Sequence, residues 1–97
     1  MPSYVTLINW TDQGVKNFKD TVDRYEAAQE AMSQGGVTFR DIYWTVGPYD
    51  LVGIVEAPDD ETATAALLSV AGQGNIRTTT LRAFNASEMR SVIEKAT

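Results

Sequence analysis

The residues best suited to chemistry in this chain form the turn Gly47-Pro48-Tyr49-Asp50. A phenol can donate a proton and a carboxylate can act as a base, so Tyr49 and Asp50 could work together at the mouth of a binding cavity. Geometry alone also explains this composition, because glycine accepts unusual dihedrals, proline fixes φ and aspartate bonds nearby backbone amides. No activating partner is visible in the sequence. Both interpretations therefore stay open, and no catalytic residue is assigned.

Three further side chains are candidates for contacting a ligand. Asn9 interrupts the apolar face of a predicted strand, and it either contacts a ligand or satisfies backbone groups near Thr11. Trp44 either packs in the core or lines an aromatic pocket. Arg82 either pairs at the surface, with Glu56 as an available partner, or holds a carboxylate or enolate by a forked hydrogen bond.

The composition removes most familiar catalytic groups. The chain has 97 residues with no cysteine and no histidine, which excludes thiolate and imidazole chemistry, Ser-His-Asp triads and histidine-bound zinc or haem. The acidic run Asp59-Asp60-Glu61 lacks the ligand spacing of a calcium loop and is typical of a helix start. We therefore predict neither a metal nor a cofactor.

The charge and hydropathy pattern limits the kinds of partner. The formal net charge is −5, with Lys+Arg 8 against Asp+Glu 13, which opposes binding to the phosphates of nucleic acid. No apolar run approaches the ~20 residues that span a bilayer, and the segment Met1–Tyr4 lacks the basic start of a secretory signal. We expect a cytoplasmic protein with neither a nucleic acid nor a membrane as partner.

Four extended runs are expected to position the candidate residues. In the second run, Phe39 and Tyr43 should share one face, with Ile42 and Trp44 on the other. The third run, LVGIVE, is almost wholly apolar, which is typical of a strand buried on both faces. The runs cover Tyr4–Trp10, Val37–Val46, Leu51–Glu56 and Asn75–Phe84.

Three segments have helical character. The first extends from Asp12 to the glycines Gly35-Gly36 and carries an apolar stripe at helical spacing. The second follows Pro58 and ends near Ala71, and the third begins after Asn85, which forms a capping-box pattern with Glu88. The stripe of the first helix, predicted to face the core, consists of Val15, Phe18, Val22, Tyr25 and Met32.

The order of these elements is βαββαβ with a terminal helix, over a single domain covering residues 1–97. This order predicts an α+β, ferredoxin-like fold in which two helices cover one face of a four-stranded antiparallel sheet. The other face keeps large apolar side chains and has no helix to cover it. We therefore predict a homodimer that pairs these faces, and leave a higher oligomer open.

Three blocks of sequence carry a family resemblance: Tyr43–Asp50, Val55–Glu61 and Arg77–Phe84. The chain resembles the GYD-domain family of small bacterial proteins from Tyr4 to about Glu94, with Pro48 separating the glycine and tyrosine of the Gly-Tyr-Asp motif. The resemblance implies a dimeric α/β-barrel, in which two ferredoxin-like sheets enclose a cavity. Barrels of that group include cofactor-free monooxygenases, haem-degrading enzymes, lactone isomerases and amino-acid-sensing domains, so the fold alone does not transfer a function.

The leading hypothesis is a homodimeric α/β-barrel protein that binds an unknown small organic ligand between its sheet and the partner. One alternative is a cofactor-independent monooxygenase or isomerase acting on an aromatic or polyketide-like substrate. The other alternative is a structural or protein-interaction module. The five candidate ligand-binding residues are Asn9, Trp44, Tyr49, Asp50 and Arg82.

Overall fold

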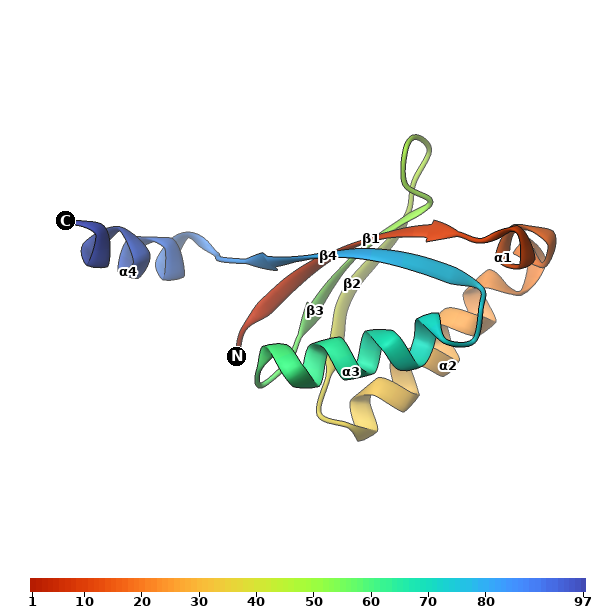
Figure 1. Cartoon of the computed structure of the whole chain (residues 1–97), viewed down its shortest axis with the longest axis horizontal. Coiled ribbons are helices and arrows are strands. Elements are labelled where there is room, and N and C mark those ends of the chain that lie inside the picture. Colours follow the sequence, from red (N-terminus) through yellow and green to blue (C-terminus); the bar gives the residue numbers. More distant parts are fainter.

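A four-stranded antiparallel sheet organises the molecule. The computed structural model describes all residues 1–97, and its strands lie in the order β2-β3-β1-β4 (Figure 1). This arrangement confirms the predicted ferredoxin-like α+β fold, with β1 and β3 at the centre of the sheet. The strands are β1 (Ser3–Trp10), β2 (Thr38–Trp44), β3 (Leu51–Glu56) and β4 (Ile76–Ala83).

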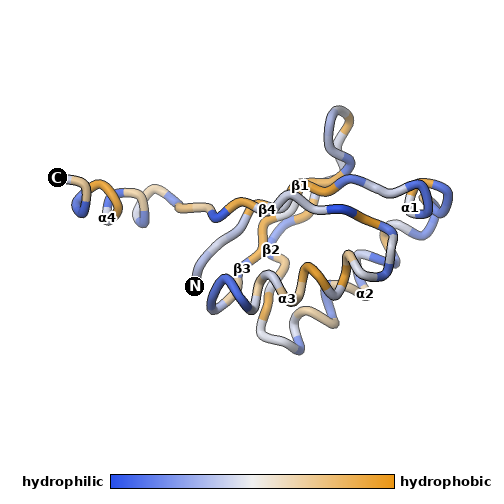
Figure 2. Tube along the Cα trace, in the orientation of Figure 1, coloured by the Kyte–Doolittle hydropathy of each residue, from blue (hydrophilic) through white to orange (hydrophobic).

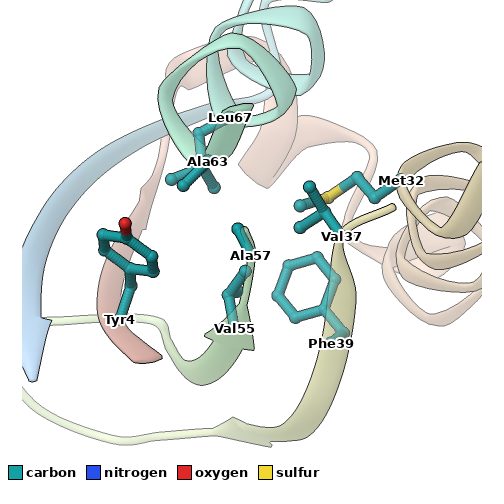
Figure 3. Close-up of a cluster of buried hydrophobic side chains, with 8 residues drawn as sticks. All are labelled: Tyr4, Met32, Val37, Phe39, Val55, Ala57, Ala63 and Leu67. Atoms are coloured by element: carbon teal, nitrogen blue, oxygen red, sulfur yellow. The ribbon is translucent and has the colours of Figure 1, made fainter. Parts of the chain in front are cut away.

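Helices α2 (Thr21–Gln34) and α3 (Asp60–Ala71) lie on the same face of this sheet (Figure 1). The core forms between them and the sheet, where apolar side chains from both layers meet (Figure 3). Burial of such side chains removes apolar area from water and is the main stabilising contribution to the fold. The buried cluster contains Tyr4, Met32, Val37, Phe39, Val55, Ala57, Ala63 and Leu67.

Burial alternates along the central strand β1. Tyr4, Thr6 and Ile8 point toward the helices and are buried, whereas the residues between them are only partly covered. The Thr6 hydroxyl lies 3.2 Å from that of Thr80 on β4, which satisfies the one buried polar side chain of this strand. In β3 the same alternation leaves Val52 partly exposed, so within one chain the strand is buried on one face and not on both.

The first predicted helix is interrupted, which corrects the prediction of one continuous helix. It consists of α1 (Asp12–Lys16), a short 3-10 helix η1 (Phe18–Asp20) and α2. The Arg24 guanidinium donates to the carbonyl of Asn17 at 2.7 Å and to that of Gly14 at 3.2 Å, so it holds the interruption in place.

This interruption changes which side chains reach the core. Val15, Phe18 and Val22 are 47%, 55% and 49% exposed, so the first half of the predicted apolar stripe does not face the core. Only Met32 of that stripe is fully buried, with Tyr25 packed against the core cluster. The spacing therefore predicted the core-facing side of α2 from Tyr25 onward, but not the first turn of α2 or the turns before it.

A β-bulge in β2 corrects the predicted faces of that strand. The register shifts between Phe39 and Asp41, so Phe39 pairs with Val55 while Trp44 pairs with Leu51, both on the helix side. Tyr43 therefore lies on the opposite face from Phe39. An extra residue in one strand reverses the alternation beyond it, which the period of two could not reveal.

The predicted helix starts are confirmed at two positions. The Asp59 carboxylate accepts from the Thr62 amide at 2.7 Å and caps α3. Asn85 and Glu88 form both hydrogen bonds of a capping box at the start of α4 (Ala86–Ala96). The sequence therefore determines the starts of these two helices locally.

Candidate binding surfaces

The carboxylate of the predicted turn is used by the backbone of β1. Asp50 Oδ2 accepts from the Trp10 amide at 2.9 Å, and the Asp50 amide donates to the Ile8 carbonyl at 2.8 Å. Asn9 donates through Nδ2 to the Pro48 carbonyl at 2.8 Å. The two side chains therefore tie the turn to the end of β1, which is the structural one of the two roles considered for each.

The turn itself has a glycine-dependent backbone. Gly47 adopts φ +145°, a conformation that side-chain-bearing residues rarely reach, and the Thr45 hydroxyl donates to the Tyr49 carbonyl at 2.6 Å. The Tyr49 phenol makes no hydrogen bond and is partly exposed. Of the candidates at this end, the Tyr49 hydroxyl alone is free to contact another molecule.

Trp44 lies on the helix side of the sheet. Its ring contacts Tyr25 edge to face with centroids 5.9 Å apart, and its Nε1 donates to the Thr21 hydroxyl at 3.0 Å. Tyr25 in turn meets Phe39 at 5.4 Å. Trp44 is therefore part of the packing between β2 and α2 and does not line the uncovered face.

Arg82 lies at the other end of the sheet, where its partners are backbone carbonyls and aromatic rings. Its Nη1 donates to the Ser3 carbonyl at 3.1 Å and to the Ala83 carbonyl. The guanidinium carbon is 4.5 Å from the centre of the Phe84 ring and 5.6 Å from that of Tyr4. Glu56 pairs instead with Arg40, at 3.6 Å. One edge of the guanidinium remains available for a ligand.

Beside Arg82, a tyrosine and an aspartate form a pair that sequence reasoning missed. The Tyr4 hydroxyl donates to Asp60 Oδ1, and Tyr4 is only 4% exposed. Burial, and after it the Asp60 carboxylate, raises the pKa of the Tyr4 phenol above its usual 10.0. This phenol is therefore a hydrogen-bond donor and not a base near neutral pH.

Tyr4 and Asp60 open onto a groove of about 370 Å³ between α3 and the edge strand β4. Leu67 and Leu68 provide apolar contact on the helix side, while Thr78 and Thr80 provide hydroxyls on the strand side. The sequence did hold one signal for this groove: Thr78 and Thr80 are two residues apart in an extended run, so their hydroxyls share one face of the strand. Arg82 completes the lining at one end.

The face of the sheet opposite α2 and α3 is uncovered (Figure 1). The pairing register places Val5 opposite Ile54 and Leu81, and Leu7 opposite Val52 and Thr79. We call this surface the open face. The loop between β2 and β3 rises on the same side (Figure 1). The open face consists of Ser3, Val5, Leu7, Asn9, Thr38, Asp41, Tyr43, Val52, Ile54, Glu56, Arg77, Thr79, Leu81 and Ala83.

Comparison with known proteins places the chain in a family. The model of the GYD domain matches residues 4–93, which is most of the chain. The chain belongs to the GYD-domain family. In this GYD-domain protein the glycine and the aspartate of the motif shape the turn, and the tyrosine between them presents the free hydroxyl.

A relative from Thermus thermophilus matches the GYD-domain protein almost from end to end. It is 34% identical over 90 residues, which cover 92% of this chain and 95% of the relative. That relative is named glutamine synthetase and cystathionine beta-lyase binding protein.

Two regulatory proteins of Mycobacterium tuberculosis share the fold of the GYD-domain protein. A feast or famine regulatory protein complexed with L-methionine superposes with a TM-score of 0.68 at 19% identity, covering 89% of this chain and 52% of its own. A leucine response regulatory protein gives a TM-score of 0.66 at 19% identity, covering 88% and 51%. The chain thus spans about half the length of these structures, and the likeness concerns the fold.

The five candidate residues of this GYD-domain protein do not converge on one point. Asn9 and Asp50 meet at the end of β1, whereas Arg82 pairs in register with Tyr4, five residues back along that strand. At about 3.4 Å per residue the two positions are roughly 17 Å apart. Within one chain they do not form a single site for an enolate.

No group of three or more carboxylates converges in a way that could hold a metal ion. None of the helices combines the length and the apolar character that crossing a membrane requires.

Proposed function

We propose that this protein is a cytoplasmic, homodimeric binding protein that engages a metabolic enzyme and carries out no reaction itself. The observation that carries the proposal is the open face, whose apolar centre is covered by no element of the chain. The name and the end-to-end match of the Thermus relative supply the kind of partner.

The total exposed area of the chain supports association with a second copy. A compact monomer of 10.6 kDa is expected to expose roughly 5,500 Å². The chain exposes 6403 Å², an excess of about 900 Å² over that expectation. A stable protein interface covers about 800 Å² on each partner, so the excess matches one such interface.

The use of the chemistry-bearing side chains supports binding over catalysis. Asn9 and Asp50 are bound to backbone groups of the turn and of β1. The Tyr4 phenol is held in its neutral form by burial and by Asp60. A general base must be free to reach a substrate proton. The Asp50 carboxylate accepts from the Trp10 amide and the Asp60 carboxylate accepts from the Tyr4 hydroxyl, so neither is free in this way.

The homodimer is tested by a charge on the open face. Leu7→Glu places a carboxylate at the centre of that face, where Leu7 is only partly covered within one chain, so the variant should fold. Gln29→Glu adds the same charge on the exposed side of α2 and serves as the control. Sedimentation equilibrium should find dimers for the wild type and Gln29→Glu, and monomers for Leu7→Glu. A dimer unaffected by Leu7→Glu contradicts the proposed interface.

Enzyme binding is tested with purified partners. The glutamine synthetase and the cystathionine β-lyase of the organism that carries this protein are immobilised in turn. The wild-type protein is then applied at up to about 100 μM. We expect saturable binding to at least one of the two. If neither enzyme binds the intact dimer in this range, the proposed kind of partner is wrong.

A second candidate function, small-molecule binding, is favoured by the groove between α3 and β4. Asp60 offers a carboxylate, Arg82 a guanidinium, and Thr78 a hydroxyl beside the apolar side chain of Leu68. These groups together suit a small zwitterion with an apolar side chain, such as an α-amino acid.

An NMR titration with L-methionine tests this groove. Arg82→Gln should weaken any saturable shift changes about tenfold, because it removes the cation that would hold the carboxylate. Lys19→Gln is the control, since it makes the same charge change at an exposed position of η1, outside the groove and the open face. Equal affinities for the two variants, or no shift changes in the wild type, argue against the groove as a site.

A further inference from the structure

The C-terminal helix α4 stands away from the body of the molecule (Figure 1). None of its residues is buried, and its only hydrogen bonds to the preceding part of the chain are those to its cap residue Asn85. The radius of gyration is 14.4 Å, compared with about 12.5 Å for a compact chain of this length. The helix therefore adds length to the molecule and buries none of its own residues.

One side of α4 is nevertheless apolar. Met89, Val92 and Ile93 fall within an arc of about 100° on the helix and are 45%, 37% and 51% exposed. Leu81 and Phe84, both 49% exposed, continue this apolar surface back toward the sheet. Figure 2 shows the same hydrophobic colour at the end of β4 and along part of α4.

Such a helix needs a packing partner. It has 11 residues, and isolated helices shorter than about 12 to 15 residues are marginal in water. The capping box formed by Asn85 and Glu88 stabilises its start but covers no apolar surface. The helix is therefore expected to be stable only when its apolar side is covered.

The position of α4 indicates what covers it. The helix begins at Ala86, three residues after β4 ends at Ala83, and it continues in the direction of that strand (Figure 1). It thus extends beyond the end of the sheet and covers neither face of its own chain. A second copy seated on the open face would extend beside it, and two-fold symmetry would give each copy the same contact.

We propose that α4 is a dimer arm, whose apolar side packs against a second copy of this chain at the rim of the paired open faces. This inference rests on the proposed homodimer and adds the element that completes it. The exposed surface of α4 is part of the excess area of about 900 Å². Packing of α4 on the second copy and pairing of the two open faces would together bury about one standard interface.

A pair of matched variants tests the arm. Ile93→Glu places a charge on the apolar side of α4, and Ser91→Glu places the same charge on the opposite side, two residues away. Because no residue of α4 is buried in its own chain, both variants should fold. Sedimentation equilibrium should give a dimer dissociation constant at least about tenfold higher for Ile93→Glu, and within about twofold of the wild type for Ser91→Glu.

A second measurement follows the helix itself. In the Leu7→Glu monomer, the Cα chemical shifts of residues 86–96 should move to random-coil values, because the arm has lost the surface that stabilises it. In the wild-type dimer the same shifts should be helical.

The outcomes separate the two proposals. If Leu7→Glu dissociates the dimer while Ile93→Glu and Ser91→Glu behave alike, the arm is wrong and the open-face dimer stands. If α4 stays helical in the monomer, or if Ile93→Glu weakens only enzyme binding, the helix has another partner and the arm is also wrong. If Leu7→Glu remains dimeric, the proposed open-face interface itself fails.

Discussion

Replacing Asp50 should lower stability without abolishing binding. Asp50→Ala removes the acceptor of the Trp10 amide, a hydrogen bond of 2.9 Å at the junction of β1 and the turn. Hydrogen bonds to charged groups contribute about 1.5 to 3 kcal/mol, and the lower value applies because Asp50 is partly exposed. A loss of about 1.5 kcal/mol corresponds to a Tm lowered by about 6 to 12 °C in a domain of this size.

Two further variants make the prediction for Asp50 specific. Asp50→Asn keeps an oxygen acceptor and loses the charge, so about half of the effect is expected. Tyr49→Phe removes the neighbouring hydroxyl, which makes no hydrogen bond within the chain, and should leave Tm unchanged. Thermal unfolding must be compared at one protein concentration, because the Tm of a dimer depends on it.

A different result would refute the structural role of the motif. If Asp50→Ala unfolds at the wild-type temperature but no longer binds the partner enzyme at 20 °C, the carboxylate acts in recognition. The hydrogen bond to Trp10 would then be incidental. If both stability and binding survive, Asp50 neither stabilises the turn nor contributes to recognition of the enzyme.

Three other predictions follow from single contacts. Gly14→Ala would bring a Cβ to 2.0 Å from the Asn75 carbonyl oxygen, so it should cost about 2 kcal/mol or more in urea unfolding, whereas Gly35→Ala, with 3.5 Å to its nearest neighbour, should cost little. The raised pKa of Tyr4 means that stability is present below pH 10 and is lost as the pH rises through the folded value, so urea midpoints measured between pH 8 and 11 should fall less for Tyr4→Phe. The Thr62 amide lowers the pKa of Asp59 below its usual 3.8, so this carboxylate contributes stability that is lost on acidification through the folded value; Asp59→Asn should reduce the acid dependence of Tm below about pH 4.

The elements that the sequence predicted well are those with local signals. The run Leu51–Glu56 is the strand as observed, and the caps at Asp59 and Asn85 begin the predicted helices. In each case the deciding contacts lie within a few residues along the chain. The interruption near Asn17 is held instead by Arg24, and Gly14 before it lies against Asn75, a contact so distant in sequence that it leaves no periodic signal.

The candidate site shows the same division. Residue types indicated that Asn9 and Asp50 would meet polar groups, but those groups proved to be the Pro48 carbonyl and the Trp10 amide. Residue type alone does not distinguish an aspartate that accepts a hydrogen bond from the backbone from one that acts as a catalytic base. The pair of Tyr4 and Asp60 joins positions 56 residues apart, and only the fold brings them together.

The prediction of a dimer rests on the apolar surfaces that no element of the chain covers. Strand β1 carries apolar residues on both faces: Ile8 is buried on the helix side, and Leu7 is partly exposed on the other side. Both faces of the sheet are therefore apolar and need to be covered. The chain supplies α2 and α3 to one face, while α4 continues beyond β4 and covers neither (Figure 1). One chain therefore leaves an uncovered sheet face and an uncovered helix side. Two copies can cover both at once, which is why the charges at Leu7 and Ile93 should weaken the same dimer.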